Sequence, residues 1–416
     1  MPSPTPTAPT APGLQFASRL NNVSTSAIRE IFKLLGRPGI ISFAGGFPDP
    51  ALFDVEGIRE ATGQALSDST AGAVLQYGAT EGWQPLKEAI AHQMAAKGIR
   101  VQPDGLITTT GSQQALDLIG KTMISPGDKV IVEGPTFLAT IQCFRLYGAD
   151  LISAPIDADG VQVDVLEQLI ITHQPKLVYL IPNFGNPSGA MLTLERRQKI
   201  LQLALKYQVL VVEDDPYGEL YFDQPPPPSI MALSQDLPDA RPYLAYCGSF
   251  SKVLSPGLRV GWMIAPPELL AKAVMCKQFS DAHTSNLSQA IAANYLALKD
   301  GGQSRLDKSL AAVRTTYAQR ATSMAACLQR ELGSALTYTQ PQGGMFFWTR
   351  LTGAGGATQD ATAYAKRAPD HGIAFVPGAP FYAVNPDNAT LRLSYATSDL
   401  TKIEEGVARL AKALPD

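Results

Sequence analysis

From residue 106 onward, short apolar segments alternate with segments whose apolar residues recur at helical spacing. The helical segments include Gln113–Met123, Leu138–Tyr147 and Leu194–Tyr207. The apolar segments are rich in Val, Ile and Leu and predict seven strands: Leu106–Thr110, Lys129–Glu133, Asp150–Ala154, Leu177–Ile181, Val209–Glu213, Leu244–Cys247 and Val260–Ile264. Because buried strands alternating with helices form parallel sheets covered on both faces, we expect an α/β fold around a mostly parallel seven-stranded sheet. Ligands of such folds bind beyond the carboxyl ends of the strands.

The two ends of the chain differ from this central alternation. Residues 1–14 are rich in Pro, Thr and Ala and predict a disordered tail. Residues 15–50 predict an N-terminal arm, with a helix and a short strand, that forms part of a smaller domain. Residues 51–305 hold the alternating pattern and predict a large ligand-binding domain. Residues 306–416 predict a small α+β domain, entered through a long helix.

The composition is that of an ordinary globular protein and excludes several function classes. The 416 residues are 45% hydrophobic and 17% charged, with a net charge of −3. Nucleic-acid and membrane-surface partners usually require a basic patch, so neither is expected. The chain shows no secretory signal and no uninterrupted apolar run of ~18 residues, which favours a cytoplasmic location. Its four cysteines lack metal-ligand spacing, so we expect free thiols and no metal site.

The segment Gly248–Trp262 carries the most specific chemistry. Lys252 follows two hydroxyl side chains, Ser249 and Ser251, and Arg259 comes seven positions after it. A partly desolvated Lys can lose its proton and form an imine. Two hydroxyls and an Arg fork are suited to hold a phosphate dianion. The segment therefore predicts a site that covalently binds a phosphorylated aldehyde, although a lone Ser-Lys pair would more often be a surface loop.

Two glycine-containing turns could approach such a ligand closely. The turn Gly111-Ser112-Gln113 leaves a predicted strand and opens a helix, and free N–H groups at a helix start bind anions. A plain Ser N-cap would look the same. A second turn, at Gly45, follows a short strand and allows backbone contact with a ligand, or is simply a turn.

These landmarks, in this order, resemble the class I/II aminotransferases of fold type I. The resemblance rests on Gly111-Ser112-Gln113, Asn186-Pro187, Asp214-x-x-Tyr217, Ser249-x-Ser251-Lys252, Arg259 and Arg392, and it covers the chain from about residue 15 to the end. Within this family, the chain resembles the 2-aminoadipate and kynurenine aminotransferases in particular. The resemblance implies pyridoxal 5'-phosphate as cofactor, a role in amino-acid metabolism, and an amino acid and a 2-oxo acid, such as 2-oxoglutarate, as substrates. It also implies a homodimer.

The resemblance also implies roles for individual residues. Lys252 is the Schiff-base residue and proton carrier, Asp214 pairs with the pyridine nitrogen, and Tyr217 and Asn186 reach the phenolate oxygen of the cofactor. Asp215 is the alternative to Asp214 as the ring partner, and the Asp-x-x-Tyr spacing favours Asp214.

The remaining predicted contacts concern the ring, the phosphate and the substrate. Phe137 would stack on the cofactor ring, or else pack in the core. Tyr77 would reach the phosphate of the partner subunit. Arg392 would bind the substrate carboxylate with Asn186 and Gly45 nearby, or else form an ion pair between domains. Arg29 would meet an acidic substrate side chain, or else lie on a helix surface.

Other functions stay open from the residues alone. A β-lyase or a decarboxylase would use nearly the same site, because the orientation of the broken bond decides the reaction. A transcription regulator that binds the cofactor as a signal could share the fold, but it would require a DNA-binding domain. The amino donor stays open between 2-aminoadipate, aromatic and branched-chain amino acids.

Overall fold

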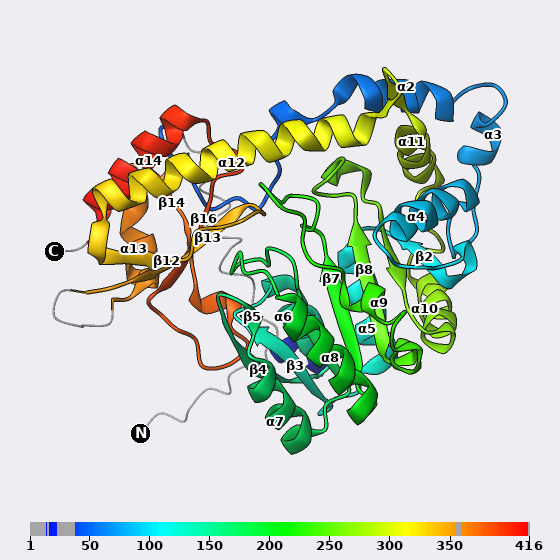
Figure 1. The fold of residues 1–416 in the computed structure, drawn as a ribbon, viewed down its shortest axis with the longest axis horizontal. Helices are drawn as coiled ribbons and strands as arrows, with labels where there is room; N and C mark the ends of the chain where they lie inside the picture. Colours follow the sequence, from blue (N-terminus) through cyan, green and yellow to red (C-terminus); the bar gives the residue numbers. More distant parts are fainter. Residues whose placement is uncertain (1–13, 15, 23–37, 354–358, 415–416) are drawn as a thin grey trace, which may run out of the picture.

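A computed structural model describes residues 14, 16–22, 38–353 and 359–414. Its centre is an eight-stranded sheet with the strand order β2-β9-β8-β7-β6-β3-β4-β5 (Figure 1). In chain order the strands are β2 (Leu106–Thr109), β3 (Lys129–Gly134), β4 (Asp150–Asp157), β5 (Gly160–Val161), β6 (Leu177–Leu180), β7 (Leu210–Asp215), β8 (Leu244–Ser249) and β9 (Gly261–Ile264). The fold class expected from the alternating pattern is confirmed.

The central sheet is mostly parallel, as the sequence predicts. Strands β4, β3, β6, β7 and β8 run parallel to one another, and β9 runs antiparallel between β8 and β2. All seven predicted strands are present, but the predicted count was one short. The additional strand β5 has two residues and forms a hairpin with β4. A strand that short has no periodicity for a sequence pattern to reveal.

Helices flank this sheet and complete the core. The helix α5 (Ser112–Met123) packs on β8 and β9 and on two further helices, α6 (Leu138–Leu146) and α10 (Pro267–Ser280). Its inward side chains, among them Leu116 and Ile119, are almost fully buried. The other helices of this part are α2 (Val55–Ala65), α3 (Ala71–Val74), α4 (Gln84–Ala96), α7 (Val163–His173), α8 (Leu194–Tyr207), α9 (Ile230–Leu233) and α11 (Asn286–Ala297).

A second, smaller layer stands beside the main sheet. It is a four-stranded antiparallel sheet of β12 (Leu336–Tyr338), β13 (Phe346–Leu351), β16 (Thr390–Ser394) and β15 (Val376–Pro377). The 27-residue helix α12 (Arg305–Glu331) begins beside α2 and α11 of the larger part and runs to this smaller unit, where α13 (Ala361–Arg367) and α14 (Leu400–Ala413) lie (Figure 1). The exact domain boundaries at residues 50 and 305 stay predictions.

The N-terminal part joins the smaller unit. The strand β1 (Ile41–Ser42) pairs in parallel with β14 (Ile373–Ala374). Residues 23–37, which hold most of the predicted arm helix and Arg29, lie outside the described residues. In the part of the chain that the structure describes, no helix has the length and apolar character needed to cross a membrane. No group of three metal-ligating side chains is found there either.

Candidate active site

A cavity of about 430 Å³ opens beyond the carboxyl ends of strands β6, β7 and β8. It is the place where ligands of open parallel sheets bind. Most of the residues predicted for the site line this cavity: Ser112, Gln113, Phe137, Asn186, Asp214, Tyr217, Ser249, Ser251, Lys252, Arg259 and Arg392. The chain brings them there from the main sheet and, in the case of Arg392, from strand β16 of the smaller sheet.

One end of the cavity is built to hold an anion. Helix α5 begins at Ser112, and the residue before it, Gly111, has a φ of 80° and gives no side-chain cap. Ser112 is therefore the first residue of the helix and not its N-cap, so the plain N-cap interpretation is wrong. A helix start without a side-chain cap presents its N–H groups and the positive end of the helix dipole to a ligand.

Two serines and an arginine stand at the same end. Arg259 Nη1 donates to Ser251 Oγ at 3.4 Å, and Arg259 Nη2 donates to the carbonyl oxygen of Thr110 at 3.2 Å. Ser249 Oγ in turn donates to Ser251 Oγ at 3.0 Å. The guanidinium and both hydroxyls thus converge on the start of α5, and their combined chemistry suits a phosphate group.

Lys252 lines the same cavity. Its ammonium donates to the carbonyl oxygen of Gly46 at 2.7 Å. Burial, together with the positive charges of Arg392 and Arg259, lowers the pKa of Lys252 to about 8. A lysine with this pKa supplies an appreciable fraction of neutral amine near neutral pH, which an imine-forming or proton-carrying lysine requires.

Asp214 is the acid of the cavity. Its side chain is only 2% exposed, and Tyr179 Oη donates to its Oδ2 at 2.8 Å. Its other oxygen, Oδ1, is buried and has no hydrogen-bond partner among the described residues. Burial raises the pKa of Asp214 to about 7, the bond from Tyr179 opposes this rise, and the charge of Asp215 adds to it. An unpaired buried carboxylate oxygen beside a cavity calls for a donor from a ligand.

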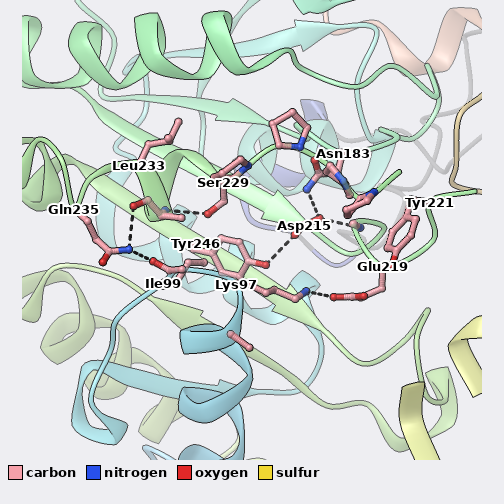
Figure 2. Close-up of a pocket in the computed structure, with 18 of the residues that line it drawn as sticks. Lys97, Ile99, Asn183, Asp215, Glu219, Tyr221, Ser229, Leu233, Gln235 and Tyr246 are labelled. Atoms are coloured by element: carbon pink, nitrogen blue, oxygen red, sulfur yellow. Dashed lines mark hydrogen bonds and ion pairs between the residues drawn. The ribbon is translucent and has the colours of Figure 1, made fainter. Parts of the chain in front are cut away.

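Asp215 points to the opposite side of the sheet, because successive residues of a strand alternate between its faces. Its Oδ1 accepts from Asn183 Nδ2 at 2.9 Å and from the Gly218 N–H at 3.0 Å, and its Oδ2 accepts from Tyr246 Oη at 2.9 Å. Figure 2 shows these bonds in a separate cavity of about 650 Å³. Of the two acids that the sequence left open, only Asp214 lines the cavity that contains Lys252.

Arg392 closes the other end of the cavity. Its Nη1 donates to Asn186 Oδ1 and its Nη2 to the carbonyl oxygen of Ala44, both at 2.7 Å. The guanidinium carbon stands 4.3 Å above the ring centroid of Phe346 and 5.1 Å from that of Phe381. Burial lowers the pKa of Arg392 to about 10. The observed partners are an amide and a carbonyl rather than a carboxylate, which agrees poorly with an ion pair between domains.

Tyr217 and Phe137 form the walls between these ends. Tyr217 packs edge-on against Phe346, with ring centroids 6.1 Å apart, and burial raises the pKa of its hydroxyl. Phe137 is half-buried and lines the cavity directly before helix α6. Gly45 is not among the lining residues, although its neighbour Gly46 is.

Tyr77 does not reach the cavity within this chain. Tyr77 is 84% exposed and contacts His283 edge-on, with ring centroids 5.9 Å apart. Arg29 lies outside the described residues.

Sequence reasoning also missed two contributors. Tyr179 was hidden as one aromatic residue in an apolar strand, and Phe381 stands in a segment of the smaller unit that carries none of the recognised motifs.

Comparisons with known proteins agree with this geometry. The family described as aminotransferase class I and II matches residues 43–410. The chain is 42% identical to a 2-aminoadipate transaminase from Thermus thermophilus, with 96% of both sequences covered. It is 38% identical to aromatic-amino-acid aminotransferase 1 from Thermococcus litoralis, covering 96% of this chain and 94% of the relative.

A solved structure shows the same fold with a cofactor adduct. It is an α-aminoadipate aminotransferase, also from Thermus thermophilus, complexed with N-(5'-phosphopyridoxyl)-L-leucine. The TM-score is 0.86, the sequence identity is 40%, and 96% of both chains is covered. The protein therefore belongs to the class I and II aminotransferases and is an enzyme that transfers amino groups with pyridoxal 5'-phosphate as its cofactor.

Proposed function

We propose that the enzyme moves the amino group of an L-amino acid to a 2-oxo acid, with 2-oxoglutarate as the acceptor. The observation that carries this proposal is the pair formed by Lys252 and Asp214. Both line one cavity, with an amine whose pKa is lowered to about 8 and a buried carboxylate oxygen that lacks a partner among the described residues. These are the two groups that the aldehyde and the ring nitrogen of the cofactor require.

The residues of the cavity fit the cofactor at both of its ends. Asp214 Oδ1 would accept from a protonated pyridine nitrogen, which satisfies an otherwise unpaired buried oxygen. Arg259, Ser249, Ser251 and the start of α5, with Gly111, Ser112 and Gln113, would hold the phosphate. When bound, the cofactor supplies an electron sink that stabilises negative charge at the substrate Cα.

Lys252 has two tasks in this proposal. Its Nζ would hold the cofactor covalently before substrate arrives, and once released it would carry a proton between the substrate Cα and C4′ of the cofactor. The lowered pKa suits both tasks, because a neutral amine is needed for each. The neighbouring charges of Arg392 and Arg259 help to keep this amine neutral.

Further side chains orient the cofactor and the substrate. Tyr217 and Asn186 would donate to the phenolate oxygen of the cofactor, and Phe137 would stack on its ring. Arg392 would bind the substrate α-carboxylate with its guanidinium fork, close to the backbone at Gly45. The fork is already aligned by Asn186 and by the aromatic rings beside it.

The amino donor is proposed from the relatives and from the cavity wall. The similar proteins are named for 2-aminoadipate and for aromatic amino acids. Phe47, Phe137 and Leu138 give the wall an apolar character that suits aromatic or branched side chains. Arg29 remains the proposed partner of an acidic side chain, which would favour 2-aminoadipate.

We also propose a cytoplasmic homodimer that has neither nucleic acid nor membrane as a partner. The support is the exposed position of Tyr77, 84% accessible on the surface of the single chain. A large exposed aromatic side chain beside other apolar residues is typical of an interface. In the dimer, Tyr77 would reach the phosphate in the partner subunit.

Two measurements test the proposed function. Borohydride treatment of the holoenzyme, followed by peptide mass spectrometry, should place the reduced cofactor on Lys252. A panel of amino acids with 2-oxoglutarate should then show glutamate formation with 2-aminoadipate, aromatic or branched-chain donors. Attachment at another lysine would contradict the assigned site. Release of pyruvate and ammonia from a cysteine conjugate, without a 2-oxo acid, would favour a β-lyase instead.

A further inference from the structure

A lysine ammonium is buried close to the anion-binding end of the cavity without lining it. Lys277, on helix α10, has a side chain with 0% exposure. Its Nζ donates to both carboxylate oxygens of Asp281, at 2.8 and 2.9 Å, and to Gln114 Oε1 at 2.9 Å. Burial of a charged ammonium is costly even when it is paired. The position of Lys277 therefore calls for a structural or functional reason.

The hydrogen bonds of Lys277 extend through Gln114 and Asp281 to Thr110, the first residue of the turn 110–113. Gln114 Oε1 also accepts from the Thr110 N–H at 2.8 Å, and Gln114 Nε2 donates to Asp281 Oδ2 at 2.7 Å. Thr110 Oγ1 donates to the same Asp281 oxygen at 3.2 Å. We refer to Lys277, Asp281, Gln114 and Thr110 as the Lys277 network.

The network and Arg259 hold Thr110 at three points. Its N–H bonds to Gln114, its hydroxyl to Asp281, and its carbonyl oxygen accepts from Arg259. The next residue is Gly111, which turns the chain into helix α5. Fixing Thr110 therefore fixes the direction in which the first N–H groups of α5 point.

Strand β9 closes the turn from the other side. A Cβ atom on Gly261 would lie 2.7 Å from both the carbonyl carbon of Gly111 and the nitrogen of Ser112. Only glycine allows this close approach of the two backbones. The turn is thus enclosed between β9 and the Lys277 network, and donors held in advance bind a ligand more strongly than donors that must be ordered on binding.

We propose that Lys277, acting through Asp281 and Gln114, is a positioning residue that sets the geometry of the turn 110–113 for the cofactor phosphate. This inference rests on the proposed function of that turn. The ammonium draws the amide of Gln114 and the carboxylate of Asp281 together, and both hold Thr110. Without the ammonium, Asp281 loses its counter-charge and Gln114 Oε1 loses one of its two donors, so only the direct bond from Gln114 Nε2 still joins the two side chains. The turn then no longer presents one fixed arrangement.

The alternative is that Lys277 only fastens α10 to α5. A second lysine provides the matched control for that role. Lys121 Nζ bonds to Asp117 at 2.8 Å and to Ser280 Oγ at 2.9 Å, so it joins the same two helices away from the turn. Loss of Lys121 removes a contact between the helices without touching Thr110.

The test compares two ligands that differ only in the phosphate. The full-length protein is freed of cofactor and titrated with pyridoxal 5'-phosphate and with pyridoxal, using the visible absorbance band. In Lys277→Met, the Kd for pyridoxal phosphate should rise about tenfold or more, whereas the Kd for pyridoxal should change less than about twofold. Lys121→Met should bind both ligands as the unmodified protein does. Asp281→Asn should also weaken the binding of pyridoxal phosphate selectively, by a smaller factor. If Lys277→Met does not fold, Asp281→Asn takes its place in the test.

Each outcome is informative. A selective loss of phosphate-dependent affinity supports the positioning role. An equal loss for both ligands, or the same loss in Lys121→Met, overturns it in favour of simple fastening. If the unmodified protein itself binds pyridoxal as tightly as pyridoxal phosphate, the proposed phosphate site fails and this inference falls with it.

Discussion

Asp214 and Asp215 are neighbours in the chain, yet they lie in two different environments. Asp215 is satisfied by Asn183, Tyr246 and a backbone N–H, on the face shown in Figure 2. Asp214, on the cavity face, receives one bond from Tyr179, and its Oδ1 has no partner among the described residues. The same side chain at the end of the same strand thus stabilises the fold on one face and is left to meet a ligand on the other.

Two buried arginines show the same contrast between complete and incomplete hydrogen bonding. Arg197, on the Asp215 face, donates to the carbonyl oxygens of Leu192 and Pro182, at 2.8 and 3.1 Å, and to Asn183 Oδ1 at 2.5 Å. Arg392, on the cavity face, has a buried Nε without a partner in the part of the chain that the structure describes. In these two pairs of residues, the side chain with complete hydrogen bonding is the structural one, and the side chain with an unpaired buried atom lines the ligand cavity.

Replacement of Lys252 should have the largest effect on the cavity face. Lys252→Ala removes both the covalent attachment and the proton carrier, so we expect turnover to fall by about 10⁴-fold. The visible band of the attached cofactor should disappear, while the far-UV circular dichroism stays unchanged. Turnover within tenfold of the unmodified enzyme would contradict the role of Lys252.

The paired acids give the next largest effect and test the comparison directly. Asp214→Ala should keep the fold but lower kcat by about 10²-fold or more, because the ring nitrogen loses its charged partner. Asp215→Asn should leave kcat within a few-fold and lower Tm, because it weakens three structural bonds. Steady-state kinetics and thermal unfolding of both variants check this, and equal loss of kcat would remove the distinction between the two faces.

Substitutions of the two buried arginines should also differ in what they change, with smaller effects than those of the acids. Arg392→Lys keeps the charge but loses the planar fork, so KM for the amino acid should rise about 10- to 100-fold while the cofactor stays bound. Arg197→Met should instead lower the free energy of unfolding by about 3 kcal/mol, since it leaves buried acceptors without their donor. A KM defect in Arg197→Met without loss of stability would show that the faces are not independent.

The sequence revealed the cavity face far better than the structural face. Lys252, Asp214 and Arg259 stand in short motifs with fixed spacing, and the buried strands before them place them at one edge of the sheet. Tyr179 and the Lys277 network could not be predicted, because their partners are distant in sequence: Gln114 and Lys277 are 163 residues apart. Such bonds depend on how the helices pack, and no local pattern records that.

The smallest expected effect concerns pH. The pKa of Asp214 is raised to about 7, so in the cofactor-free protein its contribution to stability is present below the unfolded value of 3.8 and is lost as the pH rises through 7. Binding of a protonated ring nitrogen would pair the ionised carboxylate and remove this loss. The increase in Tm on adding cofactor should therefore be larger at pH 8 than at pH 6.

Asp214→Asn isolates this effect from that of its neighbours. Lys252 favours cofactor binding in the same direction, because more of its amine is neutral as the pH approaches its pKa of about 8. The contribution of Lys252 persists in the variant. Burial also raises the pKa of Glu133 to about 8, and the charge of Asp214 adds to this rise, so the variant removes that part as well. The difference between the two pH values should shrink by about 2 °C in Asp214→Asn, roughly the shift that 1 kcal/mol gives a large domain. An unchanged difference would mean that Asp214 does not carry the charge that the cofactor meets.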